Sequence, residues 1–267
     1  MHAISVIIPM YNAEKTIVGA LESVRNQIYK AHYQIIVIND GSTDRSLQVV
    51  NRYMQEHPEM DITIIDKPNG GVSSARNAGF RQATGQWLAL LDSDDQWLPN
   101  KMEVQMKILE EHPTIDFIGS SIIGQHIRIL WRLKDKLSPI KVWELFIRWH
   151  PWTPTCVFRR TILQDVGFYN ESMHYAEDGE YLLRICMQKN CWYTPEQLVF
   201  CGGGKPGFGH SGLSANLKGM QQGQEAIIEY AYQHGAINGI QKVLFLAYSQ
   251  FKNRRREFIV WMRKFNQ

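Results

Sequence analysis

The 267-residue sequence is poor in the features that assign a protein class at once. It has four cysteines, none of them in a C-x-x-C pair, which excludes the common zinc-ribbon and dithiol motifs. So few cysteines are more typical of a reducing compartment than of a disulfide framework. The first residues carry no basic leader with a cleavage site, and no segment is apolar over a bilayer-spanning length. We therefore expect a protein of the cytoplasm.

An excess of charge of either sign is also lacking, since the net charge is only +3. The basic residues are nevertheless concentrated in residues 252–264, which hold six of them and one acid, Glu257. Aromatic and aliphatic residues are interleaved with these cations over residues 251–265. Two interpretations stay open: the segment lies on an anionic membrane, or it packs on the domain with its basic face in water. No base-reading motif accompanies the charge, so we expect no nucleic-acid partner.

Four apolar, β-branched runs in the first hundred residues predict strands that are covered on both faces. Helical patterns separate the runs, and each begins near an Asn, Ser or Thr that can cap it. The predicted strands are residues 4–9, 33–40, 61–66 and 86–92, and the predicted helices are residues 13–27, 42–56 and 73–83. This alternation predicts an α/β fold with a mostly parallel central sheet flanked by helices.

The later sequence predicts further elements and a helical end. These are helices at residues 100–111 and 175–190, a strand at 115–123, a less regular aromatic-rich region at 125–160, and helices at 217–234 and 238–265. We expect one domain over residues 1–215, with halves at 1–98 and 99–215, and a basic helical extension over residues 216–267.

Polar residues follow three of the predicted strands at the point where each strand ends. They are Pro9, Tyr11 and Asn12; Asn39, Asp40, Gly41 and Ser42; and Asp92, Ser93, Asp94 and Asp95. Ligands of parallel α/β sheets bind outside the carboxyl ends of the strands. The sequence therefore predicts that these three groups form one site.

The acidic group "DSDD" at residues 92–95 has two interpretations. Magnesium is typically held by one or two carboxylates plus substrate phosphates, and D-x-D at a strand end supplies such carboxylates. An isolated D-x-D is more often a solvated turn before a helix. The other polar groups at the same edge favour the metal-and-phosphate interpretation.

Two further stretches have the chemistry to bind a nucleotide. Asp40 either accepts an N–H from a nucleobase or caps the helix that follows. In "PNGGVSSARNAG" at residues 68–79, glycines such as Gly70 allow close backbone approach, and Arg76 either binds a phosphate or base or is simply exposed. Tyr11 either stacks on the base or packs against the protein. The glycine-rich stretch is neither a Walker loop nor G-x-G-x-x-G.

Five stretches, in order, resemble the inverting family 2 glycosyltransferases with the GT-A (Rossmann-like, nucleotide-binding) fold. They are "ISVIIPMYN", "VINDGSTD", "GGVSSARNAG", "WLALLDSDDQWLP" and "AEDGEYLLR", and they cover about residues 1–190. The resemblance implies a nucleotide-sugar donor, usually a UDP-sugar, and a divalent cation, Mg²⁺ or Mn²⁺. It assigns the donor to the half at residues 1–98 and the acceptor to the half at 99–215.

We expect donor contacts from Pro9, Tyr11, Asn12, Asp40, Gly70, Arg76, Asp92, Ser93 and Asp94. By resemblance, Pro9 and Tyr11 belong to the base-contacting loop, and Asp40 is the acid that holds the base. Arg76 corresponds to the arginine near the nucleotide, and the D-x-D holds ribose and metal.

The remaining expected site residues concern the metal and the proton. Asp94 and Asp95 are the expected metal ligands, and His210, in a glycine-rich loop, is either a third ligand or an exposed histidine. By resemblance, Asp178 is the general base, and we expect Glu177 to hold a donor or acceptor hydroxyl. Two acids at a helix start can also simply complement the helix dipole.

Together these features predict an inverting enzyme that moves one sugar to a glycan hydroxyl. A metal stabilises the leaving diphosphate, and a carboxylate takes the proton of the attacking hydroxyl. The Q-x-x-R-W motif of processive synthases is lacking, which favours single transfer. We expect an acceptor linked to undecaprenyl diphosphate in bacterial surface polysaccharide (O-antigen type) synthesis, with the enzyme at the inner face of the cytoplasmic membrane. A nucleotidyltransferase and a non-catalytic nucleotide-sugar-binding protein remain the alternatives.

Overall fold

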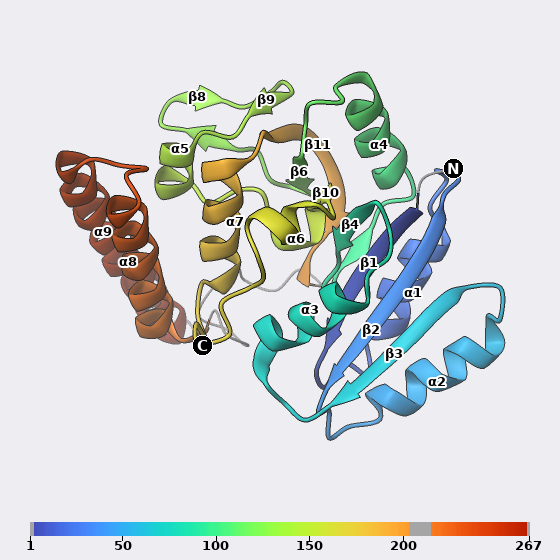
Figure 1. The fold of residues 1–267 in the computed structure, drawn as a ribbon. Coiled ribbons are helices and arrows are strands. Elements are labelled where there is room, and N and C mark those ends of the chain that lie inside the picture. Colours follow the sequence, from blue (N-terminus) through green and yellow to red (C-terminus); the bar gives the residue numbers. More distant parts are fainter. Residues whose placement is uncertain (1–2, 203–214, 266–267) are drawn as a thin grey trace.

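The structure of the chain, a computed structural model, describes residues 3–202 and 215–265. Within these residues the central sheet has nine strands, in the order β3-β2-β1-β4-β10-β6-β11-β5, with β9 paired to β11 (Figure 1). The strands are β1 (Ala3–Met10), β2 (His32–Asp40), β3 (Asp61–Lys67), β4 (Trp87–Leu90), β5 (Gln96–Trp97), β6 (Phe117–Ile122), β9 (Ser138–Pro139), β10 (Val157–Arg159) and β11 (Cys191–Phe200), and β7 (Arg128–Ile129) pairs separately with β8 (Arg132–Leu133). The helices are α1 (Ile17–Arg25), α2 (Ser46–Glu56), α3 (Gly71–Gln82), α4 (Lys101–Glu111), α5 (Val142–Ile147), the 3₁₀ turn η1 (Thr153–Thr155), α6 (Ile162–Asp165), α7 (Glu177–Gln188), α8 (Leu217–Gln233) and α9 (Gly239–Phe265).

Strands β1 to β4 form the parallel part of the sheet and correspond to the four predicted strands. Strand β1 lies between β2 and β4, and β2 pairs with β3. Ile7 belongs to a core that includes residues of α3 and α7, whereas Val6 and Ile8 belong to a second core with α1, α2 and α4. Because both faces of β1 are covered, its sequence is apolar throughout rather than alternating.

Helices α1 and α2 begin later than the sequence predicts, at Ile17 and Ser46. The residues expected in their first turns form loops that bind each other across the end of the sheet. The predicted side-chain caps are wrong for α1, α2 and α3, because their N-cap residues, Thr16, Arg45 and Gly70, make no capping hydrogen bond through their side chains. Tertiary hydrogen bonds therefore decide where these helices start.

The second part of the sheet mixes strand directions. Strand β10 lies antiparallel between β4 and β6, while β11 runs parallel to β6. Strand β5 precedes position 98 in the sequence yet pairs with β11 at the far edge. One continuous sheet therefore joins the two expected halves, and it carries the loops of both to a common site.

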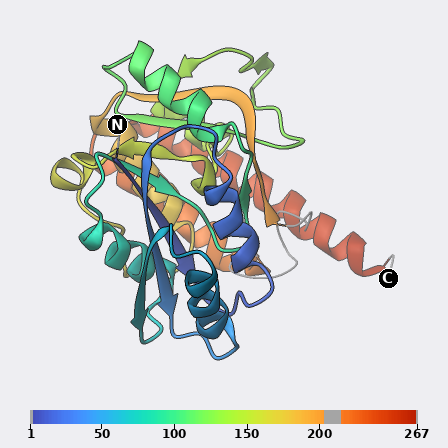
Figure 2. The same ribbon diagram turned by 90° about the vertical axis from the view of Figure 1, so that its right-hand side faces the viewer.

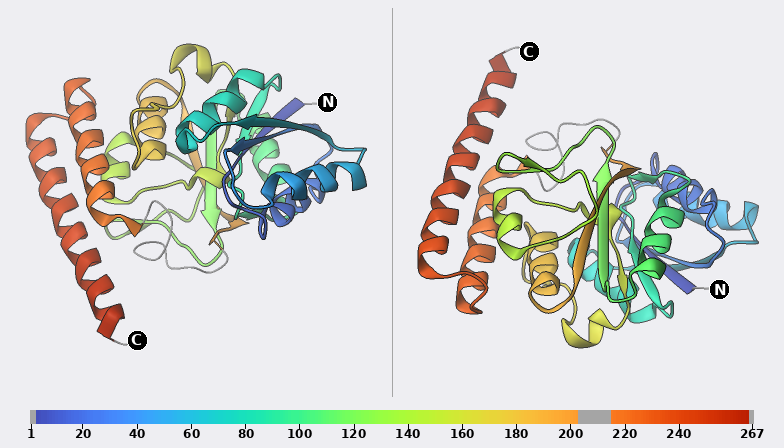
Figure 3. Two further views of the ribbon diagram at one scale, coloured as in Figure 1. Left: turned by 90° about the horizontal axis from the view of Figure 1, so that it is seen from below. Right: turned by 90° about the horizontal axis from the view of Figure 1, so that it is seen from above.

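Helices α8 and α9 lie side by side along one edge of the molecule, next to α5 and α7 (Figures 1 and 3). Asn216 caps α8 by accepting a hydrogen bond from the Gly219 amide at 2.9 Å. The C-terminal half of α9 projects beyond the neighbouring helices (Figure 2). Among the described residues, no helix combines the length and the apolar character needed to cross a bilayer.

Candidate active site

The loops after β1 and β2 are joined at the carboxyl edge of the sheet, as predicted. The Asn12 Oδ1 atom accepts a hydrogen bond from the Thr43 amide at 2.8 Å, and the Asn12 amide donates to Ser42 Oγ at 3.0 Å. Asn12 has φ of 49°, in the left-handed region that asparagine tolerates better than most residues. Pro9 is buried near the end of β1, whereas the Tyr11 side chain is 53% exposed. The loop thus presents a tyrosine ring to solvent at this edge.

Asp40 is a buried carboxylate that holds the N-terminus of α3. The Gly70 amide donates to Oδ1 at 2.9 Å and the Gly71 amide to Oδ2 at 2.8 Å, and Lys67 forms an ion pair with Oδ1. A carboxylate has about four acceptor positions, so these contacts leave room for one further donor. Asp40 caps a helix, but the helix is α3 rather than the one that follows it in sequence.

Gly70 fits this arrangement because its backbone lies against the polar side chains of Lys67 and Ser74. A Cβ atom at Gly70 would lie 2.9 Å from Lys67 Nζ and 2.9 Å from Ser74 Oγ. A larger residue would push Lys67 away from Asp40 or move the start of α3. The Gly70 backbone thus lies close to Lys67, and its close approach to a nucleotide stays a prediction.

Arg76 is a buried cation that links the two halves of the site. Its Nη2 atom lies 2.8 Å from Asp92 Oδ1 and its Nη1 atom 3.3 Å from Glu177 Oε1. The guanidinium carbon lies 5.2 Å from the centre of the Tyr169 ring. Its Nε atom is buried and has no hydrogen-bond partner among the described residues. Arg76 is not the exposed helix arginine that the sequence left open.

The acidic residues after β4 are placed differently from one another. Asp94 is exposed, Asp92 and Ser93 are half-buried, and Asp95 is only 6% exposed. The Gly202 amide donates to Asp95 Oδ1 at 2.7 Å. Burial, together with repulsion from Asp92 and Asp94, raises the pKa of Asp95 to about 8. Burial and the acidic neighbours thus favour the protonated form of Asp95, and Asp94 is the carboxylate of this turn that faces solvent.

No three His, Cys, Asp or Glu side chains form a ready-made metal site in the part of the chain that the structure describes. Magnesium commonly needs only one or two carboxylates when substrate phosphates complete its oxygen ligands. The exposed Asp94 fits that role, and the raised pKa of Asp95 shows that this cluster would gain from added positive charge. His210, the other expected ligand, lies outside the described residues.

Glu177 and Asp178 form the first turn of α7, directly after Ala176, which has φ of 56°. Burial and the neighbouring Asp178 raise the pKa of Glu177 to about 7. Burial also raises the pKa of Asp178, although the positive charge of Arg76 opposes this shift. Asp178 accepts hydrogen bonds from the Gly179 amide at 2.8 Å and from Thr153 Oγ1 at 3.5 Å.

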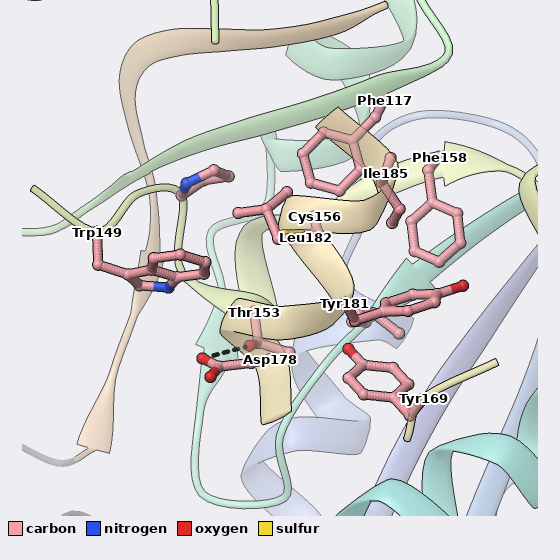
Figure 4. A pocket seen from close by; sticks show the side chains of 12 residues that line it. Phe117, Trp149, Thr153, Cys156, Phe158, Tyr169, Asp178, Tyr181, Leu182 and Ile185 are labelled. Atoms are coloured by element: carbon pink, nitrogen blue, oxygen red, sulfur yellow. Dashed lines mark hydrogen bonds between the residues drawn. The ribbon is translucent and has the colours of Figure 1, made fainter. Parts of the chain in front are cut away.

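A small aromatic-lined cavity of about 20 Å³ adjoins Asp178 (Figure 4). It is large enough for about one water molecule and too small for a sugar ring. The rings of Trp149, Tyr169 and Tyr181 contribute to its lining, with Thr153 beside the carboxylate. These apolar surroundings disfavour the ionised form of Asp178, so the carboxylate would take up a proton more readily than a solvated aspartate.

Several residues of the site were not predicted from the sequence. Lys67 directly follows the strand predicted at residues 61–66, at the same edge as Asp40, and that position is a signal that points to it. Tyr169 and Thr153 lie in segments without a local pattern, so only the fold places them near Arg76 and Asp178.

Comparison with known proteins gives a consistent assignment. Residues 5–167 match the family model described as glycosyl transferase family 2. The chain is 32% identical over 196 residues to the minor teichoic acid biosynthesis protein GgaB of Bacillus subtilis, covering 69% of this chain and 21% of GgaB. It is 28% identical over 193 residues to the poly(ribitol-phosphate) β-N-acetylglucosaminyltransferase TarS of Staphylococcus aureus, covering 71% of this chain and 33% of TarS. The chain thus spans only a minor part of each of these two relatives.

Two solved structures have the same fold. One is S. aureus TarS 1–349 in complex with UDP-GlcNAc, with a TM-score of 0.69 and 20% identity over 93% of this chain and 71% of that chain. The other is the mannosyltransferase PcManGT from Pyrobaculum calidifontis in complex with GDP-Man and Mn²⁺, with a TM-score of 0.68 and 19% identity over 92% of this chain and 68% of that chain. The predicted fold class is confirmed: a large α/β sheet flanked by helices, as in GT-A glycosyltransferases.

Proposed function

Since the chain belongs to glycosyl transferase family 2, we propose that it moves one sugar from a nucleotide-sugar to a glycan hydroxyl with inversion. One observation carries this proposal. Arg76 bridges Asp92, in the acidic turn after β4, to Glu177, beside the candidate base. These ion pairs would hold the proposed phosphate-and-metal site next to the proposed base, which is the arrangement that a single displacement requires.

For the donor we propose a UDP-sugar bound at the carboxyl edge of β1, β2 and β4. The exposed Tyr11 ring is available to stack on the base, and Asp40 keeps one acceptor position for a base N–H. Asp92, Ser93 and Asp94 would contact the ribose and diphosphate. Two neighbours in fold, solved in complex with UDP-GlcNAc and with GDP-Man, support a nucleotide-sugar at this type of site. Residues 1–98 would then be the donor half and residues 99–215 the acceptor half.

We propose that Asp94, with Asp95 beside it, holds Mg²⁺ or Mn²⁺ together with the donor diphosphate. The ion would act as a Lewis acid that stabilises charge on the leaving phosphate. A bound cation would offset the repulsion of Asp95 by Asp92 and Asp94. The hydrogen bond from the Gly202 amide holds the Asp95 carboxyl group in place. Buried Arg76 adds fixed positive charge beside Asp92.

Asp178 would accept the proton of the attacking acceptor hydroxyl. Its raised pKa brings it closer to neutral pH, where a general base is most effective. The hydrogen bonds from the Gly179 amide and Thr153 orient the carboxylate. Glu177 would position Arg76, with its second oxygen left for a sugar hydroxyl.

For the acceptor we propose a glycan on undecaprenyl diphosphate, in synthesis of a bacterial surface polysaccharide of the O-antigen type at the inner face of the cytoplasmic membrane. Two relatives carry names from teichoic acid biosynthesis and poly(ribitol-phosphate) glycosylation, which supports a phosphate-bearing acceptor of the cell surface. The chain belongs to a glycosyltransferase family, and no observation favours a nucleotidyltransferase. A non-catalytic protein on the same fold would also bind the nucleotide-sugar, so only a transfer assay distinguishes it from an enzyme.

Donor binding is tested by thermal shift with a panel of nucleotide-sugars, with and without Mn²⁺. We expect stabilisation by one UDP-sugar that increases with Mn²⁺, because ligand binding to the folded state raises its stability. Transfer is then tested by mixing that donor with synthetic lipid-diphosphate glycans. Binding without transfer to any acceptor would favour the non-catalytic alternative, and no stabilisation by any nucleotide-sugar would contradict the proposal.

A further inference from the structure

The face of α9 that points away from the domain is apolar and open to solvent. Ile240, Leu244, Phe251, Phe258 and Met262 follow one another at spacings of 4, 7, 7 and 4 residues, which places them on one side of a helix. Their exposed fractions are 75%, 61%, 67%, 60% and 42%. Large apolar side chains scattered singly on a surface are ordinary, but a continuous stripe of them marks an interaction site.

The opposite face of α9 is already used. Phe245 is 9% exposed and stacks on Phe146 of α5 with ring centres 4.9 Å apart. Ser249 is 2% exposed and lies 3.1 Å from the side-chain amide of Gln221 in α8. The domain therefore fixes the rotation of α9 and directs the apolar stripe outward, along a helix that projects past its neighbours (Figures 2 and 3).

Basic residues crowd together where α9 passes the end of α5. Lys252 donates to the Phe146 carbonyl oxygen at 3.0 Å, and Arg148 follows α5 directly. Burial and repulsion from Arg256 and Arg148 lower the pKa of Lys252 to about 8. Burial and repulsion from Arg148 and Arg255 lower the pKa of Arg256 as well. The fold thus brings the exposed Arg148 close to the basic segment, so that positive charge extends from α9 to the end of α5.

The charges argue against a second copy of the chain as the occupant of the stripe. Arg254 and Arg255 flank the stripe near the middle of α9, and Glu257 is the only acid in the whole helix. Two copies packed face to face, parallel or antiparallel, would bring four arginines together with little compensating charge. An anionic bilayer instead offers negative headgroups for the cations and an apolar interior for the aromatic side chains.

We propose that the outer face of α9, with the exposed cations Arg254 and Arg255 that flank its apolar stripe, binds the surface of an anionic lipid bilayer. The helix would lie in the plane of the interface, with its apolar stripe from Ile240 onward immersed. The surface is longer than the basic segment at residues 251–265, because the apolar stripe begins at Ile240. The inference does not depend on the proposed reaction, because vesicle binding needs neither donor nor acceptor.

Vesicle flotation with the full chain tests this proposal. The probes are vesicles of phosphatidylcholine alone and vesicles with about one third phosphatidylglycerol, because the second type carries the negative surface potential. We expect binding to the anionic vesicles at least about tenfold tighter than to the neutral ones, and weaker binding at high salt. No binding, or equal binding to both vesicle types, would overturn the proposal.

Two variants locate the surface. The double variant Phe251→Glu/Phe258→Glu should lower vesicle affinity at least about tenfold, since two aromatic side chains no longer enter the interface. The double variant Arg254→Ala/Arg255→Ala should lower it about twenty-five-fold, at about fivefold per basic residue. All four side chains are exposed, so thermal melting should be unchanged.

Matched controls carry the same chemical changes elsewhere on the surface. Trp131→Glu alters a side chain that is 77% exposed between β7 and β8, and Arg52→Ala removes an exposed cation from α2. Both should retain wild-type vesicle binding, and a loss equal to that of the α9 variants would refute a localised surface. Light scattering tests whether a second copy of the chain covers the stripe instead. A stable dimer that Phe251→Glu/Phe258→Glu converts to monomers would show this and would overturn the proposal.

Discussion

Lys101 is buried without a compensating acid, and replacing it by methionine should stabilise the protein. Its side chain is 0% exposed at the start of α4, and Nζ lies 4.1 Å from the centre of the Trp97 ring. The nitrogen also contacts Met102 Sδ at 3.6 Å, and no ion pair to Lys101 is present among the described residues. Burial lowers its pKa to about 7.

The size of the effect follows from linkage between protonation and folding. The pKa is about 7 in the folded chain against an ordinary value of 10.5. The unfolded chain therefore binds the proton more tightly, and at pH 7.5 this destabilises the folded state by about 4 kcal/mol. The cost is complete below the folded pKa and decreases as pH rises toward the unfolded pKa, reaching about 2 kcal/mol at pH 9.

Urea unfolding of wild type and Lys101→Met at pH 6.5, 7.5 and 9 measures this difference. The variant should be more stable by a few kcal/mol at pH 7.5, after loss of the cation–π contact, and the gain should shrink toward pH 9. Lys107→Met is the matched control, because Lys107 lies on the same helix with its side chain 72% exposed and should change stability by less than about 0.5 kcal/mol. If Lys101→Met is less stable than wild type, or if its gain in stability does not depend on pH, the prediction is refuted and the Lys101 ammonium group is stabilised by a partner in the folded protein.

Three further predictions concern the candidate active site. Asp178→Asn should lower transfer about 10²- to 10⁴-fold while donor affinity by calorimetry stays nearly constant, and equal loss of both would mean that Asp178 binds the donor. Because burial raises the pKa of Asp178, kcat/KM should begin to fall with decreasing pH at a higher pH than it would for a solvated aspartate base; a fall that begins only near pH 4 would show that burial does not raise the pKa of the base. Arg76→Met should reduce stability by about 3 kcal/mol in urea unfolding, because it leaves Asp92 and Glu177 facing each other without a cation, whereas Arg81→Met, at a residue whose side chain is 58% exposed, should have little effect. A loss below about 1 kcal/mol for Arg76→Met would mean that both acids are protonated or solvated instead.

The two sides of the site differ in how much the sequence discloses. Asp40, Asp92 and Asp94 each follow a strand whose apolar run is visible locally, so a general rule for parallel sheets places them at one edge. Asp178 follows no such strand, and only the likeness to a family indicated a catalytic role. Its position near Arg76 results from tertiary contacts between α3 and α7, such as the ion pair of Arg76 with Glu177, which no local pattern records.

The sequence also could not distinguish residues of the same type within one motif. Asp94 and Asp95 are adjacent, yet one is exposed and the other is buried against the Gly202 amide, more than a hundred positions later. Asp40 was open to capping or to base binding, and the structure shows that its oxygens hold the start of α3. These differences depend on partners that approach from distant segments.

By itself the sequence determined the four parallel strands, the helices between them, the carboxylates at their ends and, through the order of its motifs, the family. Those features follow from local periodicity and from chain direction. The tertiary structure alone decided the insertion of the three-residue strand β10 between β4 and β6, the capping of α3 by Asp40, and the outward rotation of the apolar face of α9. Each depends on contacts between residues far apart in the chain, whose free energy is set by which surfaces meet and not by any short run of side chains.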